Sequence, residues 1–155
     1  MLKEIDGTDR LLIHALQENA RLTSGGLAQR VNLSQSPSWR RIKRLEDEGV
    51  ITGYHAALDR RAIGFGVLAF VMVAIDHQNE ASSISFEKAV LAIPEVVIFH
   101  AISGPVDFLL AVVAKDLDAY SDLLQTKLHR LPGVRQLHSH FSLQDFKGQI
   151  GGLPV

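Results

Sequence analysis

The sequence predicts an α+β protein, with an N-terminal winged helix-turn-helix followed by a ferredoxin-like βαββαβ domain. Two observations predict it. Residues 1–52 contain three short helical patterns, whereas residues 65–147 contain β-branched apolar runs interleaved with two helical patterns. We therefore expect a first domain at 1–52, a linker strand at 53–64, a second domain at 65–147 and a mobile tail at 148–155.

The first domain is expected to begin with three helices. Leucines at helical spacing indicate the first helix, for which Asp6 or Thr8 is the expected N-cap. A second helix is expected over residues 23–31, and Asn32 after it tolerates the left-handed backbone that ends a helix. Ser34 is then the expected N-cap of a third helix, which continues to about residue 48.

The stability of the second helix and the residues after the third helix carry two further expectations. Gly25 and Gly26 lie in the second helix, which we expect to fray because a glycine in a helix interior costs ~1 kcal/mol relative to alanine. The β-prone residues 50–55 follow the third helix and predict the strand of the wing.

The second domain shows a different periodicity. Strands are expected at residues 67–75, 96–102, 108–114 and 134–143, and helices at about 82–92 and 117–131. A sheet with helices on one face should alternate apolar and polar residues, but the strands at 67–75 and 108–114 barely alternate. The helix-free face therefore also needs a cover, and we infer an obligate homodimer through this domain.

The composition excludes several classes of protein. The 155 residues are 46% hydrophobic and 21% charged with a net charge of −1, which excludes a largely disordered chain. The absence of cysteine excludes disulfides and thiolate sites. The acidic N-terminus lacks the apolar core of a signal peptide, and the longest apolar run is far shorter than the ~20 residues of a membrane helix. We expect a soluble, cytoplasmic protein without a membrane segment.

Positive charge is concentrated in the third helix, where four of the ten Lys and Arg of residues 1–62 fall within 40–44. On a helical wheel the inward side chains are Ser38, Ile42 and Leu45, and the outward ones include Ser36, Arg40, Lys43 and Asp47. An outward face of Ser, Arg and Lys suits the major groove of DNA, where Arg contacts guanine and Lys or Ser contacts phosphates or base edges. Outside a helix-turn-helix, such a charge run is more often a solvated face.

Short motifs extend along most of the chain. In the first domain they include Asp6-x-x-Asp9, Leu27-Ala28-x-Arg30-Val31, Leu33-Ser34-x-Ser36-Pro37 and Arg41-Ile42-Lys43-Arg44-Leu45-Glu46. In the second they include Pro94-Glu95-Val96, Ser103-Gly104-x-x-Asp107-Phe108 and Leu131-Pro132-Gly133-Val134. Together, in this order and at this spacing, they resemble the Lrp/AsnC family of prokaryotic transcription regulators over about residues 5–147.

The resemblance implies a DNA-binding head on a ligand-sensing domain that dimerises, with dimers assembling into larger rings, often octamers. The implied partners are double-stranded DNA and a small effector, typically an amino acid. We assign DNA contacts to Ser34, Gln35, Ser36, Arg40, Arg41, Lys43 and Arg44. Arg40 and Lys43, with Ser36, are expected in the groove and the others mainly at phosphates, although Arg41 could instead pair with a carboxylate of its own domain. Trp39 could pack over the domain edge or reach the DNA.

The resemblance places the effector at a hairpin of the second domain. The residues assigned to it are His100, Ser103, Gly104, Pro105, Val106 and Asp107. Asp107 would accept the ammonium group of an amino acid, and backbone N–H groups around Gly104 would bind its carboxylate, although Pro105 removes one donor. The alternative is an ordinary hairpin in which Asp107 bonds its own turn.

Other functions have weaker support in the sequence. No catalytic constellation or phosphate-binding loop emerges, so we expect no enzyme, no cofactor and no metal. His100, His138 and His140 could hold a metal, but they are more simply polar residues near a subunit interface, and either Ser139 or His140 faces the effector pocket. Two alternatives remain: a sirohaem-decarboxylase-like enzyme on the same fold, or a sensing and assembly module without DNA binding.

Overall fold

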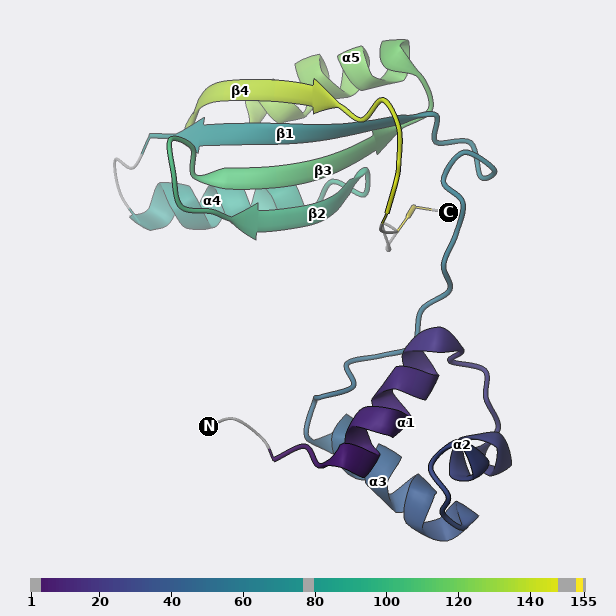
Figure 1. The fold of residues 1–155 in the computed structure, drawn as a ribbon. Coiled ribbons are helices and arrows are strands. Elements are labelled where there is room, and N and C mark those ends of the chain that lie inside the picture. The colour runs from purple at the N-terminus through teal and green to yellow at the C-terminus, as the bar shows by residue number, and fades with distance from the viewer. Residues whose placement is uncertain (1–3, 77–79, 148–152, 155) are drawn as a thin grey trace. The chain divides into compact units, whose positions relative to one another are not determined.

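The computed structural model describes residues 4–76, 80–147 and 153–154, which form two compact units, Met1–His55 and Ala56–Val155 (Figure 1). The expected tail at 148–155 lies largely outside the described residues. In the part of the chain that the structure describes, no helix is long and apolar enough to cross a membrane.

The N-terminal unit contains the three expected helices, α1 (Gly7–Glu18), α2 (Ser24–Arg30) and α3 (Gln35–Asp47). Their apolar stripes meet in a small core, which holds buried Leu12, Ala15, Leu27 and Val31. Because each helix buries one stripe only, the opposite side of α3 is left to solvent. This arrangement confirms the predicted helix-turn-helix.

Local chemistry fixes the helix ends much as the sequence predicts. Asp6 caps α1 by accepting the Asp9 N–H at 2.8 Å, and Thr23 caps α2 by accepting the Gly26 N–H at 3.2 Å. Asn32 in the turn before α3 has a φ of 52°, the left-handed conformation that asparagine tolerates. Ser34 occupies the N-cap position of α3, but its side chain makes no capping hydrogen bond.

The wing strand expected at 50–55 and the linker strand expected at 53–64 are wrong. Between Asp47 and Val67 the described chain contains no strand. A β-strand requires a hydrogen-bonded neighbour, and within residues 4–76, 80–147 and 153–154 the hydrogen-bonded ladders link only the four strands of the second unit. The N–H groups of Val50 and Ile51 instead both donate to the Leu45 carbonyl. These bonds end α3, and Gly49 makes the turn after the helix in the left-handed conformation, with a φ of 67°.

The second unit is a four-stranded antiparallel sheet in the order β2-β3-β1-β4, with helices on one face (Figure 1). Along the chain its elements are β1 (Val67–Ile75), α4 (Glu80–Leu91), β2 (Val96–Ala101), β3 (Phe108–Ala114), α5 (Leu117–Thr126), the 3-10 helix η1 (Leu128–Arg130) and β4 (Val134–Phe141). The predicted βαββαβ order is confirmed. The second helical pattern is divided into α5 and η1, and both edge strands are shorter than expected.

The sheet has two apolar faces, as its poor alternation predicts. Side chains such as Val71 and Leu110 point toward α4 and α5 and form the main core with Phe86 and Tyr120. The opposite side, called here the helix-free face, carries residues that pair across the strands: Leu68, Phe70, Met72, Leu109, Ala111, Val113 and Ile98. Leu153 covers part of it by packing with Leu68, Ala111 and Val113. Phe70 remains exposed.

Candidate nucleic-acid interface and effector site

The outward face of α3 is built as the helical wheel predicts. Ser38 and Leu45 are fully buried, which fixes the rotation of the helix in its unit. On the opposite side Ser36, Arg40 and Lys43 are exposed. Ser34 and Gln35 are exposed at the start of the helix, where free backbone N–H groups favour anionic partners.

The four cations of residues 40–44 differ in their partners. Arg40 is exposed and forms no ion pair with any residue that the structure describes. Lys43 Nζ lies 2.9 Å from Asp47 Oδ1, and both side chains are more than half exposed. An exposed pair of this kind contributes only about 0.3–0.5 kcal/mol on a helix, so Lys43 stays available to another anion.

Arg41 and Arg44 are instead held by carboxylates of α1. Arg41 Nη1 lies 2.6 Å from Asp6 Oδ2 and 2.9 Å from Asp9 Oδ1, and Arg44 Nη2 lies 2.5 Å from Asp9 Oδ2. The backbone N–H of Asp9 and then Arg41 hold the pKa of Asp6 below its usual value, while Asp6 and then Asp9 raise the pKa of Arg41. The alternative expected for Arg41, pairing with a carboxylate of its own domain, is confirmed, and Arg44 does the same.

Two further residues lie on or beside α3. Trp39 is 56% exposed, and both expectations for it, packing over the domain edge and reaching the DNA, stay predictions. A Cβ at Gly25 would lie 3.0 Å from Gln35 Nε2, which is the far end of an exposed, flexible side chain, so the contact does not require glycine. The fraying expected of α2 stays a prediction.

The predicted effector hairpin lies between β2 and β3. Ser103, Gly104 and Pro105 are exposed, and Val106 is half-buried. Asp107 Oδ2 accepts the Ile75 N–H at 2.9 Å, and the Asp107 N–H donates to the Val73 carbonyl at 2.9 Å. Asp107 therefore fastens the hairpin to the end of β1, and its carbonyl also accepts the Ile102 N–H across the hairpin at 2.9 Å.

The three histidines considered as a metal site do not come together. His138 and His140 pair with Met72 and Phe70 and so lie on the helix-free face of β4. His100 is on β2, at the opposite edge of the sheet and about three strand spacings, or ~14 Å, away. Within the described ranges no group of His, Cys, Asp and Glu could hold a metal ion.

Ser139 and His140 point to opposite sides of β4. The Ser139 hydroxyl lies 2.5 Å from the Tyr120 hydroxyl of α5, on the helix-covered face. His140 is therefore on the helix-free face, together with Phe70.

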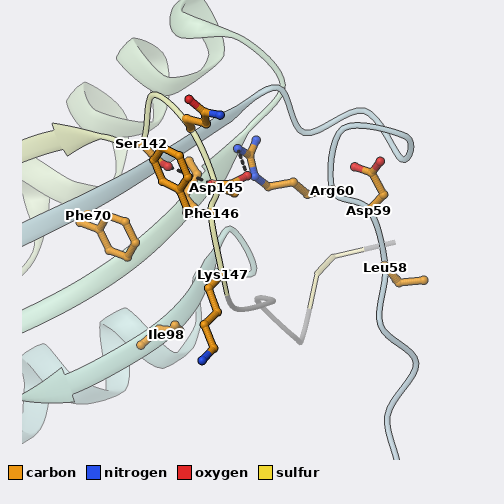
Figure 2. A pocket seen from close by; sticks show the side chains of 11 residues that line it. Leu58, Asp59, Arg60, Phe70, Ile98, Ser142, Asp145, Phe146 and Lys147 are labelled. Carbon is orange, nitrogen blue, oxygen red and sulfur yellow. Dashed lines mark hydrogen bonds and ion pairs between the residues drawn. The ribbon is translucent and has the colours of Figure 1, made fainter. Parts of the chain in front are cut away.

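A cavity of about 770 Å³ opens on the helix-free face beside Phe70 (Figure 2). Phe70 lies in the first half of β1, whereas the hairpin is fastened to Ile75 at the end of that strand. Its walls come from residues before β1, from the strands and from residues after β4: Leu58, Asp59, Arg60, Leu68, Phe70, Ile98, Ser142, Gln144, Asp145, Phe146 and Lys147. None of the predicted effector residues lines it. The sequence does not predict this cavity, because the two segments outside the strands that line it, before β1 and after β4, carry none of the motifs described above.

Comparison with known proteins now identifies the two units. Residues 5–52 match the model described as winged helix-turn-helix DNA-binding, and residues 68–150 match the Lrp/AsnC ligand binding domain. The chain belongs to the Lrp/AsnC family. The matched residues coincide with the helix-turn-helix unit and with the sheet that carries the hairpin and the cavity.

Named relatives of this Lrp/AsnC protein cover nearly its whole length. It is 34% identical to the DNA-binding transcriptional activator DecR of Escherichia coli over 92% of this chain and 94% of that protein. It is 36% identical to the Bkd operon transcriptional regulator of Pseudomonas aeruginosa, with the same coverage. A Neisseria meningitidis transcriptional regulator in complex with L-Met superposes with a TM-score of 0.90 at 36% identity, over 97% of each chain. The chain is thus a ligand-modulated, DNA-binding transcription regulator.

Proposed function

We propose that this protein binds a specific operator through α3 and that an amino acid, bound between sensor domains of neighbouring copies, changes its DNA binding or its assembly. The observation that carries the proposal is the outward face of α3, which presents Ser36, Arg40 and Lys43 around a buried anchor of Ser38 and Leu45. Such a regulator acts on DNA, so we place the protein in the cytoplasm.

Arg40 is the proposed base-contacting residue. An exposed guanidinium without an ion-pair partner among the described residues loses no intramolecular contact when it turns to the bidentate acceptors of guanine. Lys43 and Ser36 lie beside it on the same face, and Ser34 and Gln35 at the helix start are proposed phosphate contacts. No cofactor is needed for this activity.

A second copy of the chain is proposed to cover the helix-free face. Phe70 is exposed there between Leu68 and Met72, and a row of apolar side chains from β3 extends the surface. Burial of such a surface in a symmetric pair is worth about 25 cal/mol per Å² of apolar area. The cavity beside Arg60 opens on the same face, so we assign it to this interface. Larger rings, including octamers, are proposed from the family.

The effector is proposed to be an amino acid at the hairpin of residues 103–107. The support is the exposed loop around Gly104, with a φ of 143°, and the carboxylate of Asp107 at its base. The L-Met complex of the Neisseria relative supports this ligand class. Because the loop is exposed in the single chain, a neighbouring copy is needed to enclose the ligand.

Footprinting of the DNA upstream of its own gene tests the proposal. Two protected half-sites, centred about one helical turn or a multiple of it apart, are expected from a symmetric dimer with two α3 helices. Addition of individual amino acids should shift the protein concentration at which protection appears. Uniform protection without a boundary, unchanged by every amino acid, would contradict the proposal. A change of sirohaem absorbance on mixing would instead favour the enzyme alternative.

A further inference from the structure

A carboxylate is buried between α1 and α3 of the DNA-binding unit. Asp9 is only 1% exposed, yet its two oxygens accept from three donors. These donors are the backbone N–H of Asp6 at 3.1 Å, Arg41 Nη1 at 2.9 Å and Arg44 Nη2 at 2.5 Å. Asp6 Oδ2 also accepts from Arg41. We call Asp6, Asp9, Arg41 and Arg44 the Asp9 cluster.

The burial of Asp9 makes these contacts hard to give up. A buried charge that loses its partners is strongly destabilising, whereas an exposed pair breaks at little cost. Arg41 and Arg44 are therefore expected to keep their contacts with Asp9 when DNA is present. Lys43 pairs with Asp47, but both side chains are exposed, so this ion pair breaks at little cost. The same helix thus holds two retained cations and two available ones.

We propose that Asp9 is a positioning residue that keeps Arg41 and Arg44 off the DNA backbone, so that contacts by Arg40 and Lys43 dominate. Phosphate contacts add affinity for every DNA sequence alike, and base contacts distinguish one sequence from another. Retaining two arginines inside the unit lowers binding to all DNA while leaving base contacts intact. Asp9 consequently raises the ratio of specific to non-specific binding. This inference rests on the proposed DNA binding by α3.

The salt dependence of binding to a scrambled duplex tests the role of Asp9. Asp9→Asn keeps the size of the side chain and removes its charge. We expect tighter binding to the scrambled duplex at ~150 mM salt, with a slope of log K against log salt steeper by about 0.9 for each phosphate gained, for one or two phosphates. The specificity ratio should fall. Glu18→Gln is the matched control, because it removes one charge and the exposed Arg30–Glu18 pair of the same unit. Its slope should equal that of the wild type.

An unchanged or shallower slope in Asp9→Asn, with the helical circular dichroism of the wild type, would overturn the proposal, because a purely structural residue gains no phosphate contacts. If Asp9→Asn fails to fold, a second pair of variants tests the proposal. Arg44→Gln should leave the slope of log K against log salt unchanged, and Arg40→Gln should make it shallower. An equally shallower slope in both variants would show that Arg44 contacts phosphate and would overturn the proposal. A wild type that binds no DNA would instead refute the proposed function.

Discussion

Arg60 Nη2 lies 2.9 Å from Asp145 Oδ2, which joins the segment before β1 to the segment after β4 (Figure 2). Arg60 Nη1 also donates to the carbonyls of Phe65 and Gly66, each at 3.0 Å, and Asp145 Oδ1 accepts from the Ser142 hydroxyl at 2.9 Å. The guanidinium is nearly buried. One ion pair thus links the two chain segments that border the sensor sheet.

This ion pair predicts a pH-dependent contribution to stability. The hydrogen bond from Ser142 and then Arg60 hold the pKa of Asp145 below its usual value. A carboxyl whose pKa is lower in the folded state stabilises the protein above its unfolded pKa, near 4, and loses that contribution as the pH falls through the folded value. The free energy of unfolding of wild type should therefore exceed that of Asp145→Asn between pH 5 and 7. Urea titrations should show the difference shrinking below about pH 4, and a difference independent of pH would contradict the assignment.

Substitution of Arg40 should weaken specific binding. Arg40→Ala removes the proposed guanine contact, and a loss of ~1–3 kcal/mol is expected for the operator, with relaxed preference at one base position. Binding to a library of operators with single base changes measures both effects. An equal loss on every sequence would make Arg40 a phosphate contact.

Asp107 should be needed for the effector response. Asp107→Asn keeps an oxygen that can accept the Ile75 N–H and removes the charge proposed to bind the ammonium group. The fold and the dimer should persist, while the heat of amino-acid binding in calorimetry disappears. Undiminished binding by this variant would remove Asp107 from the effector site and leave it the structural role that the hydrogen bond shows.

A charge on the helix-free face should prevent dimerisation. Phe70→Glu places a carboxylate in the proposed apolar interface, where removing the charge from water opposes association even though His140 is its cross-strand neighbour. Analytical ultracentrifugation should then show a monomer. Leu91→Glu is the control, since Leu91 is an exposed leucine at the end of α4, away from that face, and its variant should stay dimeric. Dimers of Phe70→Glu would show that another surface holds the copies together.

The sequence predicts local structure in this protein well because local chemistry determines it. The cap at Asp6, the left-handed turn at Asn32 and the buried side of α3 follow from neighbouring residues. The strand order follows from the βαββαβ pattern. The wing strand fails because residues 50–55 find no partner strand among the residues that the structure describes, whatever their strand propensity.

Long-range contacts are predicted poorly for a physical reason. Arg41 and Asp9 are 32 residues apart and Arg60 and Asp145 are 85 apart, so no local pattern connects them. One signal was present for Asp9, which lies three residues before Leu12 on the apolar stripe of α1, where a carboxylate needs a buried partner. The separation of His100 from His138 depends on strand order, and the two-residue strand period then sets which face each occupies.

The proposed function requires that α3 distinguish one DNA sequence from another, and fluorescence anisotropy measures that discrimination. A labelled duplex carrying the footprinted operator and a scrambled duplex of equal length are titrated with the full chain at ~150 mM salt. We expect an affinity ratio of ~10³ or more in favour of the operator. Equal affinities for the two duplexes would show that α3 does not distinguish DNA sequences.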